Sequence, residues 1–155
     1  MSKNVVVTGA ASGIGKAIAE KYQHMGFTVI GIDKNIVECD FELFKCDLTN
    51  EKEIIDIFKI KYKKIDYLIN VAGVFFVEKR DVIADMDIIN WNATLQNNLT
   101  STMLCCKHAI PLMESDTQKD RAIVNISSDQ AFYPRKKNSA YAVSKSGISC
   151  LTKVL

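Results

Sequence analysis

Three side chains in the last third of the chain have the types and spacing of an acid–base device. Tyr141 and Lys145 lie in a stretch without Gly or Pro before Gly147, so a helix there places both side chains on one face. The apolar run over residues 121–126 predicts a buried strand that delivers Ser128 to its C-terminal edge. A phenol beside an ammonium, with a hydroxyl nearby, can move a proton to or from a reacting oxygen.

The first part of the chain has a pattern that favours dinucleotide binding. The apolar run at 5–7 predicts a buried parallel strand, and residues 8–15 follow it with the glycine spacing G-x-x-x-G-x-G. At a strand–turn–helix junction, glycines allow a tight turn, a close approach of the backbone to a pyrophosphate, and close packing of helix and strand. The helix N-terminus then faces the phosphates. The pattern predicts a helix that ends at Gly26 and has one apolar face, formed by Ile14, Ile18, Tyr22 and Met25.

Asp33 follows the second predicted strand at the distance from the glycine turn that suits contact with the adenosine ribose. A carboxylate there accepts from the ribose hydroxyls and repels a 2′-phosphate, which favours NAD over NADP. The adjacent Lys34 weakens this preference, because a cation could pair with that phosphate. The alternative is that Asp33 is an ordinary turn residue.

Apolar runs alternate with helical patterns along the chain, which predicts an α/β fold. We expect a Rossmann-type doubly wound parallel sheet in a three-layer α/β/α arrangement. The connection after Asp33 is too short to hold a full helix. The expected strands are 5–7, 27–32, 43–46, 66–71 and 121–126, and the expected helices follow the glycine turn, follow Asn50, span 88–113, and begin near Tyr141.

The inner helices carry apolar stripes at helical spacing. Thr49 or Asn50 is expected to cap the second helix, and Asn138 or Ser139 the last one. Pro111 is expected to kink or end the helix over 88–113. The expected stripes are Ile54, Ile55, Phe58 and Tyr62 in the second helix, and Leu95, Leu99, Met103, Cys106 and Ile110 in the long one.

Length and composition fit one globular domain better than a nucleic-acid or membrane protein. The chain has 155 residues, of which 48% are hydrophobic, and a formal net charge of +2. This length is enough for a single domain (1–155) with a real core. The nearly balanced charge predicts no strongly basic face, since the lysine-rich run at 59–64 suits a solvated helix end. The five cysteines form no C-x-x-C pair, which indicates reduced thiols and no metal site. The sequence shows no signal peptide or membrane span, and we therefore expect a cytoplasmic protein.

An ordered set of motifs over the whole chain resembles the short-chain dehydrogenase/reductase family. Residues 8–15 are similar to that family's T-G-x-x-x-G-x-G turn, and residues 70–73 to its N-N-A-G, with Val71 in place of an asparagine. Trp91 followed by Asn98 is similar to the helix that bears the family's catalytic asparagine. Ser128 stands thirteen positions before the Tyr141-x-x-x-Lys145 motif, which is the family's usual spacing.

The resemblance implies a set of site residues. Asp47 and Leu48 fall where the family contacts adenine. Asn98 could by spacing alone be a tolerated surface residue, but the ordered motifs favour a catalytic role. The implied catalytic residues are Asn98, Ser128, Tyr141 and Lys145, and the implied cofactor-binding residues are Gly9, Ser12, Gly13, Ile14, Gly15, Asp33, Asp47, Leu48, Asn70, Ala72, Gly73, Tyr141 and Lys145.

The implied mechanism is hydride transfer between NAD(H) and a secondary alcohol or carbonyl of a small molecule. Tyr141 would act as general acid in reduction and as general base in oxidation, although free tyrosine has a pKa near ~10. The Lys145 ammonium and an oxidised nicotinamide ring would favour its phenolate, and Lys145 would also hold the nicotinamide ribose. Ser128 would fix the reacting oxygen. Asn98 would hold a water that links Lys145 to solvent as a proton relay.

A local resemblance points to one substrate class. The stretch from Ser128 to Tyr141 is similar to that of 2,3-dihydro-2,3-dihydroxybenzoate dehydrogenases, as is the short connection after Asp33. Arg135 could then pair with a substrate carboxylate. Its alternative role is that of a solvated loop cation.

The chain stops at Leu155, within the helix that begins near Tyr141, whereas family members continue to further strands. We therefore expect a sheet that is incomplete after the fifth strand, with an open edge and an uncovered apolar face. Three alternatives follow: part of a longer chain, a truncated product that depends on a partner, or a cofactor-binding module without turnover. Two function classes thus stay open, an NAD-dependent oxidoreductase and a non-catalytic dinucleotide-binding or scaffold protein. The family also implies a homodimer or homotetramer formed through the last two long helices.

Overall fold

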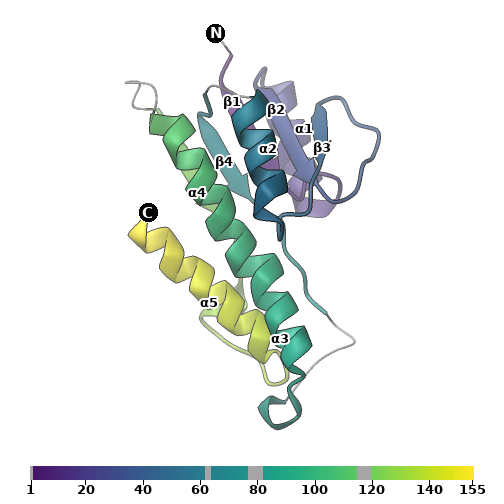
Figure 1. The fold of residues 1–155 in the computed structure, drawn as a ribbon, viewed down its shortest axis with the longest axis vertical. Helices are drawn as coiled ribbons and strands as arrows, with labels where there is room; N and C mark the ends of the chain where they lie inside the picture. The colour runs from purple at the N-terminus through teal and green to yellow at the C-terminus, as the bar shows by residue number, and fades with distance from the viewer. Residues whose placement is uncertain (1, 62–63, 77–81, 115–119) are drawn as a thin grey trace.

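Helices cover both faces of a parallel sheet in the computed structural model, which describes residues 2–61, 64–76, 82–114 and 120–155 (Figure 1). Within these ranges the sheet has the strand order β3-β2-β1-β4-β5, with every neighbouring pair parallel. The α/β doubly wound arrangement expected from the sequence is confirmed. The strands are β1 (Asn4–Thr8), β2 (Thr28–Asp33), β3 (Glu42–Lys45), β4 (Tyr67–Asn70) and β5 (Ala122–Asn125).

The strand order reverses between β1 and β4, because the chain runs outward through β2 and β3 before it crosses to the other side of β1. In an open parallel sheet, such a switch point leaves a crevice at the carboxyl ends of the two strands. The glycine turn follows β1, and the segment at residues 71–73 follows β4. Two of the sequence motifs therefore meet at the crevice.

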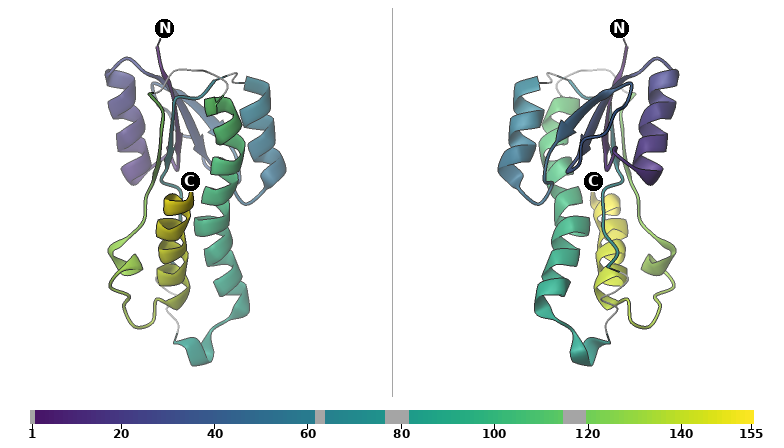
Figure 2. Two further views of the ribbon diagram at one scale, coloured as in Figure 1. Left: turned by 90° about the vertical axis from the view of Figure 1, so that its left-hand side faces the viewer. Right: turned by 90° about the vertical axis from the view of Figure 1, so that its right-hand side faces the viewer.

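The helices form two layers around the sheet. α1 (Gly13–His24) lies on one face, and α2 (Glu51–Lys61) and α4 (Ser101–Glu114) lie on the other (Figure 2). α3 (Ile88–Leu95) leads through the π-helical segment η3 (Gln96–Thr100) into α4, and α5 (Ser139–Val154) runs beside this long helix (Figure 1). Two short 3₁₀ segments, η2 (Ile83–Asp85) and η4 (Asp129–Ala131), lie in the connections. Among the described residues, no helix is both long and apolar enough to span a bilayer.

α1 ends as predicted, and of its predicted apolar face Ile18 and Tyr22 pack against the core cluster on that side of the sheet. Gly26 has φ +83°, its N–H donates to the Gln23 carbonyl at 3.0 Å, and the Phe27 N–H donates to the Tyr22 carbonyl at 3.1 Å. This pattern is a Schellman motif, which requires the left-handed residue that glycine supplies. The predicted apolar face is wrong at its ends, because the side chains of Ile14 and Met25 are 63% and 58% exposed. The buried residues of α1 are Gly15 and Ala19.

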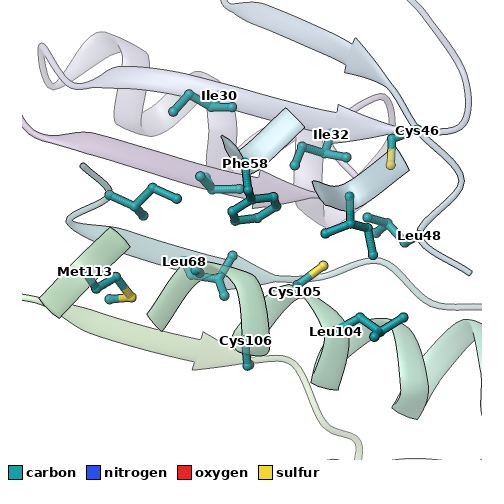
Figure 3. Close-up of a cluster of buried hydrophobic side chains, with 14 residues drawn as sticks. Ile30, Ile32, Cys46, Leu48, Phe58, Leu68, Leu104, Cys105, Cys106 and Met113 are labelled. Carbon is teal, nitrogen blue, oxygen red and sulfur yellow. The ribbon is translucent and has the colours of Figure 1, made fainter. Parts of the chain in front are cut away.

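The core consists of two clusters, one on each face of the sheet. On β1, Val6 points into the cluster under α2 and α4, whereas Val5 and Val7 point into the cluster under α1. This alternation explains why the strand is apolar throughout, since both of its faces are buried. Figure 3 shows the larger cluster between the sheet and its two helices, with Ile30, Ile32, Cys46, Leu48, Phe58, Leu68, Leu104, Cys105, Cys106 and Met113 labelled.

The long helix departs from its predicted stripe. Met103 is 37% exposed. Pro111 does not end the helix, because α4 continues to Glu114. Of that stripe, Cys106 is buried and Ile110 packs against the larger core cluster. The residues actually buried in this region are Thr94, Asn98, Ser101, Thr102, Leu104, Cys105, Cys106, Ala109 and Met113.

The other predicted helix features are mostly confirmed. Asn50 precedes α2, and its Oδ1 accepts from the Lys52 N–H at 3.1 Å, as a capping residue does. Ile54 and Phe58 are buried, whereas Tyr62 lies outside the described residues. Asn138 occupies the position before α5 but does not cap it. Its amide donates instead to Gln130 Oε1 at 2.9 Å.

The predicted uncovered apolar face is present on β5. Val124 is 44% exposed on the α1 side of the sheet, where its strand neighbour Ile69 is 4% exposed. All five cysteines are free, as predicted, and three of them are buried. Cys39 is half-buried and Cys150 is exposed.

Candidate active site

The glycine turn is built so that two of its positions exclude any side chain. Gly9 has φ +69°, and a Cβ on it would lie 3.0 Å from the Ala72 backbone. A Cβ on Gly15 would lie 2.1 Å from the Gly9 carbonyl oxygen, because α1 starts directly against the turn. Gly13 differs, since its φ is +52° but no atom lies within 4 Å of the Cβ position. Gly13 therefore faces open space at the start of the helix.

A cavity of about 340 Å³ lies over this turn, at the switch point of the sheet. Ten of the residues predicted from the sequence to bind the cofactor line it, and these are Gly9, Ser12, Gly13, Ile14, Gly15, Asp33, Asp47, Leu48, Ala72 and Gly73. Six residues outside that prediction also line it, and these are Lys34, Asn35, Cys46, Val71, Val74 and Asn97. Asn70, Tyr141 and Lys145 are absent from the lining.

The cavity fits a dinucleotide by the chemistry of its donors. α1 begins at the cavity, and Ser12, the residue before its first turn, makes no side-chain capping bond. The N–H groups of that turn are therefore available to phosphate oxygens, with the positive end of the helix dipole behind them. The crowding at Gly9 and Gly15 keeps this backbone free of side chains. The exposed Ile14 is explained by the same placement, because its side chain borders the cavity.

Asp33 stands at the end of β2 with both carboxylate oxygens held in place. Oδ2 accepts from the Ala11 N–H at 3.1 Å, and Oδ1 accepts from the Asn35 N–H at 2.9 Å. These bonds tie the carboxylate to the glycine turn and fix it on the cavity wall. Lys34 lines the same cavity, so both of the groups weighed in the sequence are present there.

Asp47 and Leu48 form the part of the lining that follows β3. Leu48 is 9% exposed and packs into the larger core cluster. Asp47 Oδ1 accepts from the Thr49 N–H at 2.9 Å and from its hydroxyl at 2.7 Å. These two donors lower the pKa of the Asp47 carboxyl from its ordinary value.

The segment after β4 is fixed from below by side chains. Thr8 Oγ1 accepts from the N–H groups of Val71 and Ala72 at 3.0 and 3.1 Å. Asn70 lies beneath the cavity rather than in its wall, where its amide donates to Asn125 Oδ1 at 2.8 Å and links β4 to β5. The position of Asn70 indicates that it supports this edge of the sheet.

Asn98 is fully buried and joins three elements. Its Oδ1 accepts from the Val74 N–H at 2.6 Å, and its Nδ2 donates to the Val74 carbonyl at 3.0 Å and to Ser144 Oγ at 3.0 Å. Both N–H groups of the amide are thus used inside the protein. A relay water, as predicted from the sequence, would have to bind Oδ1 or the main-chain carbonyl of Asn98.

α5 places Lys145 and Tyr141 together, as the spacing predicted. Lys145 is 5% exposed, its Nζ donates to the Ile126 carbonyl at 2.8 Å, and this nitrogen lies 5.9 Å from the centroid of the Tyr141 ring. Burial lowers the pKa of the Lys145 ammonium from its ordinary value. The phenol ring also packs on Phe75, with the ring centroids 4.7 Å apart.

Gly73 connects these groups to the cavity. A Cβ built on Gly73 would lie 3.1 Å from Asn98 Oδ1 and 3.6 Å from Lys145 Nζ, and Gly73 itself lines the cavity. The ammonium and the buried amide therefore stand directly behind the cavity wall. This is the junction at which an acid–base group and a dinucleotide would meet.

Ser128 follows β5, and its hydroxyl is held locally. Its Oγ donates to Asp129 Oδ1 at 3.0 Å and accepts from the Gln130 N–H at 3.2 Å. Arg135, the candidate partner of a substrate carboxylate, donates instead to Asp129 Oδ2 at 2.9 Å.

Sequence reasoning missed Thr8, Phe75, Asp129 and Ser144. A signal existed for Thr8, which begins the glycine motif, and for Ser144, which precedes Lys145 in its helix. For Phe75 and Asp129 the sequence carried no such signal, because loop backbone decides what they contact. The described residues contain no group of three or more His, Cys, Asp or Glu side chains that could hold a metal ion.

Comparison with known proteins finds dehydrogenases among the proteins that this chain is similar to. The chain is 31% identical to a 3beta-hydroxysteroid dehydrogenase of Mediterraneibacter gnavus, with 99% of the chain and 59% of that protein aligned. It is 34% identical to an NAD-dependent glycerol dehydrogenase of Listeria innocua, with 99% and 63% aligned. The ligand-free structure of an aldohexose dehydrogenase from Thermoplasma acidophilum superposes with a TM-score of 0.90 at 36% identity, over 99% of this chain and 60% of that one.

The chain thus spans about 60% of the length of these relatives. A family model described as short chain dehydrogenase matches residues 3–155, which include the glycine turn, the cavity, the buried Asn98 and the Tyr141–Lys145 helix. This chain therefore belongs to the short-chain dehydrogenase family.

Proposed function

We propose that residues 1–155 form one dinucleotide-binding catalytic domain of an NAD(H)-dependent oxidoreductase that interconverts a secondary alcohol and a carbonyl compound. The observation that carries the proposal is the junction at Gly73, where Lys145 Nζ and Asn98 Oδ1 stand behind the wall of the glycine-turn cavity. Tyr141 lies beside the same ammonium. A bound nicotinamide would supply or accept the hydride.

The side chains of the protein then supply proton transfer, cofactor binding and orientation of the reacting oxygen. Tyr141 transfers the proton to or from the substrate oxygen. Lys145 donates one N–H to the Ile126 carbonyl, which leaves two donors for the cofactor ribose. Ser128 orients the reacting oxygen. Asn98 holds the backbone at Val74 and the hydroxyl of Ser144, which in turn donates to the Tyr141 carbonyl at 2.7 Å.

The substitution Tyr141→Phe tests the catalytic part of the proposal. It removes the transferable proton and keeps the ring that packs on Phe75, so NADH binding should persist while turnover falls by a factor of ~10² or more. The matched control is Tyr133→Phe, because the Tyr133 side chain is 80% exposed. NADH fluorescence measures binding, and NADH formation with a panel of secondary alcohols measures turnover.

Two results would contradict parts of this assignment. Loss of both binding and turnover in Tyr141→Phe would show that the phenol is needed structurally. NADH binding without turnover in the wild-type chain would favour the alternative, a non-catalytic dinucleotide-binding or scaffold protein. Self-association through α4 and α5 stays a prediction that light scattering can test.

The cofactor preference follows from Asp33. We propose that its fixed carboxylate accepts from the adenosine ribose hydroxyls and repels a 2′-phosphate, so that NADH binds at least ~10 times more tightly than NADPH. Asp33→Asn keeps the shape of the side chain but removes the charge, and it should lower this ratio. The control is Lys34→Gln, which should raise the ratio, because Lys34 is the cation on that wall. A ratio that Asp33→Asn leaves unchanged would contradict the assignment.

A further inference from the structure

The ring of Phe75 packs on the phenol of Tyr141 and keeps part of its own surface open. The two ring centroids lie 4.7 Å apart, and the ring planes are tilted by 52°. Phe75 is 38% exposed. Single exposed apolar residues are common on protein surfaces and need no explanation by themselves. Phe75 differs from them because it touches the group to which the proposed function assigns the proton transfer.

The main chain holds Phe75 in this place through the residue that precedes it. Asn98 Oδ1 accepts from the Val74 N–H at 2.6 Å, and Asn98 Nδ2 donates to the Val74 carbonyl at 3.0 Å. Asn98 is fully buried, and Val74 lines the cofactor cavity. Phe75 therefore follows directly after a fixed residue, and its ring is a preformed part of the surface around the phenol.

The polar groups of the site already have partners or tasks. Lys145 Nζ donates to a main-chain carbonyl, and Asn98 uses both of its N–H groups within the protein. The proposed function gives the Ser128 hydroxyl to the reacting oxygen and the remaining Lys145 donors to the cofactor ribose. A substrate whose oxygen reaches Tyr141 therefore brings the groups next to its reacting carbon against the open surface of Phe75.

An apolar ring at this point sorts substrates by what flanks the reacting carbon. A hydrocarbon group that packs on the ring removes apolar surface from water, which is favourable. A hydroxyl in the same place loses its water partners and finds no hydrogen-bond partner on the ring, which is unfavourable. The difference acts on the flanking groups and leaves the exchange of the proton between Tyr141 and the reacting oxygen unchanged.

We propose that Phe75 is a specificity-determining residue, which makes the site select secondary alcohols with hydrocarbon groups on the reacting carbon over polyhydroxylated alcohols. The inference rests on the proposed function, because it names the substrate class of that same site. It assigns a role to a residue that neither moves the proton nor lines the cofactor cavity.

The test compares 3-pentanol with glycerol. These two alcohols have nearly the same shape, because each end of 3-pentanol carries a methyl group where glycerol carries a hydroxyl. The kcat/KM of the wild-type chain for 3-pentanol should exceed that for glycerol by about tenfold or more, the factor that corresponds to one buried hydroxyl without a partner. NADH formation from NAD⁺ measures both values.

Two substitutions separate the apolar surface of Phe75 from its bulk. Phe75→Gln supplies an amide that can bond a substrate hydroxyl, so the ratio of the two kcat/KM values should fall about fivefold, the factor for one ordinary hydrogen bond. Phe75→Leu keeps an apolar surface and should hold the ratio within about twofold of wild type. NADH affinity should be the same in both variants, because Phe75 does not line the cavity.

The matched control is Met25→Gln, which places the same amide at an exposed apolar position at the end of α1 and should leave the ratio unchanged. A merely structural role for Phe75 would lower kcat/KM for both alcohols alike, and the ratio would not move.

The outcomes distinguish this inference from the proposed function. A wild-type chain that turns over glycerol as well as 3-pentanol, or a ratio that Phe75→Gln leaves unchanged, overturns the inference and leaves the proposed function standing. If NADH binds without turnover, the same ratio is taken from the dissociation constants of the two alcohols with the NADH-loaded chain, and failure to bind either alcohol also overturns the inference. A chain that binds no NADH overturns the proposed function and this inference with it.

Discussion

Asn98 shows how much structure one buried side chain can hold in place. It lies in the π-helical segment between α3 and α4, and it is fully buried. Its amide makes the two hydrogen bonds to Val74 that a neighbouring strand would make, and a third to Ser144. The loop after β4 is thereby tied to the helix that carries Tyr141, and Phe75, the next residue of that loop, packs on the phenol.

Replacement of Asn98 by Ala should therefore destabilise the fold. The change leaves the N–H and C=O groups of Val74 without their partner, and each unsatisfied buried group costs about 1–3 kcal/mol. The Ser144 hydroxyl loses one donor but keeps its bond to the Tyr141 carbonyl. Partial access of water to Val74 reduces this sum, so we expect a loss of about 2–3 kcal/mol in the free energy of unfolding, measured by urea denaturation.

The control is Asn97→Ala in the same segment. Asn97 is half-buried, and its amide donates once, to the Ala93 carbonyl at 2.8 Å, so the expected loss is below about 1 kcal/mol. Equal losses in the two variants would mean that the contacts of Asn98 do not hold the loop after β4.

At the scale of an element, the glycine turn joins β1 to α1 with two kinds of glycine. Gly15 is required by space, because the Gly9 carbonyl occupies the position of a side chain. Gly13 is required only by its backbone conformation, because its Cβ position is open. The two positions therefore give a matched pair of substitutions within one turn.

Gly15→Ala should cost more stability than Gly13→Ala and should abolish NADH binding. A Cβ at 2.1 Å from a carbonyl oxygen forces α1 away from the turn, whereas alanine at φ +52° costs only about 1–2 kcal/mol of backbone strain. Thermal denaturation gives the stability and NADH fluorescence the binding. If both variants bound NADH as the wild-type chain does, the turn would not be the phosphate site.

The elements that the sequence predicts well are those whose surroundings are uniform. Residues 5–7 read as a strand because both faces of β1 are buried, and Gly26 marks a helix end because its position needs a left-handed residue. The predicted apolar faces of the helices fail at positions whose surroundings differ from those of the rest of the helix. Ile14 is apolar yet exposed, because it borders the cavity, and Met103 is 37% exposed although it lies at the spacing of the predicted stripe.

The candidate site divides in the same way. The glycine turn, Asp33 and the Tyr141–Lys145 pair could be predicted because each depends on spacing along a short stretch of chain, either one strand–helix–strand unit or one helix. The pairing of Asp129 with Arg135 could not, because it depends on how the loop before α5 folds back on itself.

At the scale of the whole molecule, the larger core contains three buried thiols that join its elements. Cys46 follows β3, and Cys105 and Cys106 lie in α4, on the face that packs on the sheet (Figure 3). Burial raises the pKa of Cys46 to about 12 and that of Cys106 to about 11, and it raises the pKa of Cys105 as well. These thiols stay protonated in the folded chain at pH values where an unfolded chain has lost the protons.

The stability of the fold should consequently fall in alkaline solution. An unfolded thiol titrates near ~8.5, so above that pH the unfolded chain binds fewer protons than the folded one, and the free energy of unfolding decreases as pH rises. The contribution of these thiols to the free energy of unfolding is complete below pH ~8.5, and it is lost as the pH approaches their pKa values in the folded chain. Lys145 acts in the opposite direction, because burial lowers its pKa.

A variant isolates the thiol effect from every other titrating group. Between pH 8 and 10, each buried thiol should lower the free energy of unfolding by roughly 1–2 kcal/mol, so Cys46→Ala should flatten the pH dependence by that amount even if it lowers stability at pH 8. Cys150→Ala, at an exposed position, should leave the slope unchanged. Urea denaturation at the two pH values measures both slopes, and equal slopes for wild type and Cys46→Ala would show that Cys46 ionises as freely in the folded chain as in the unfolded one.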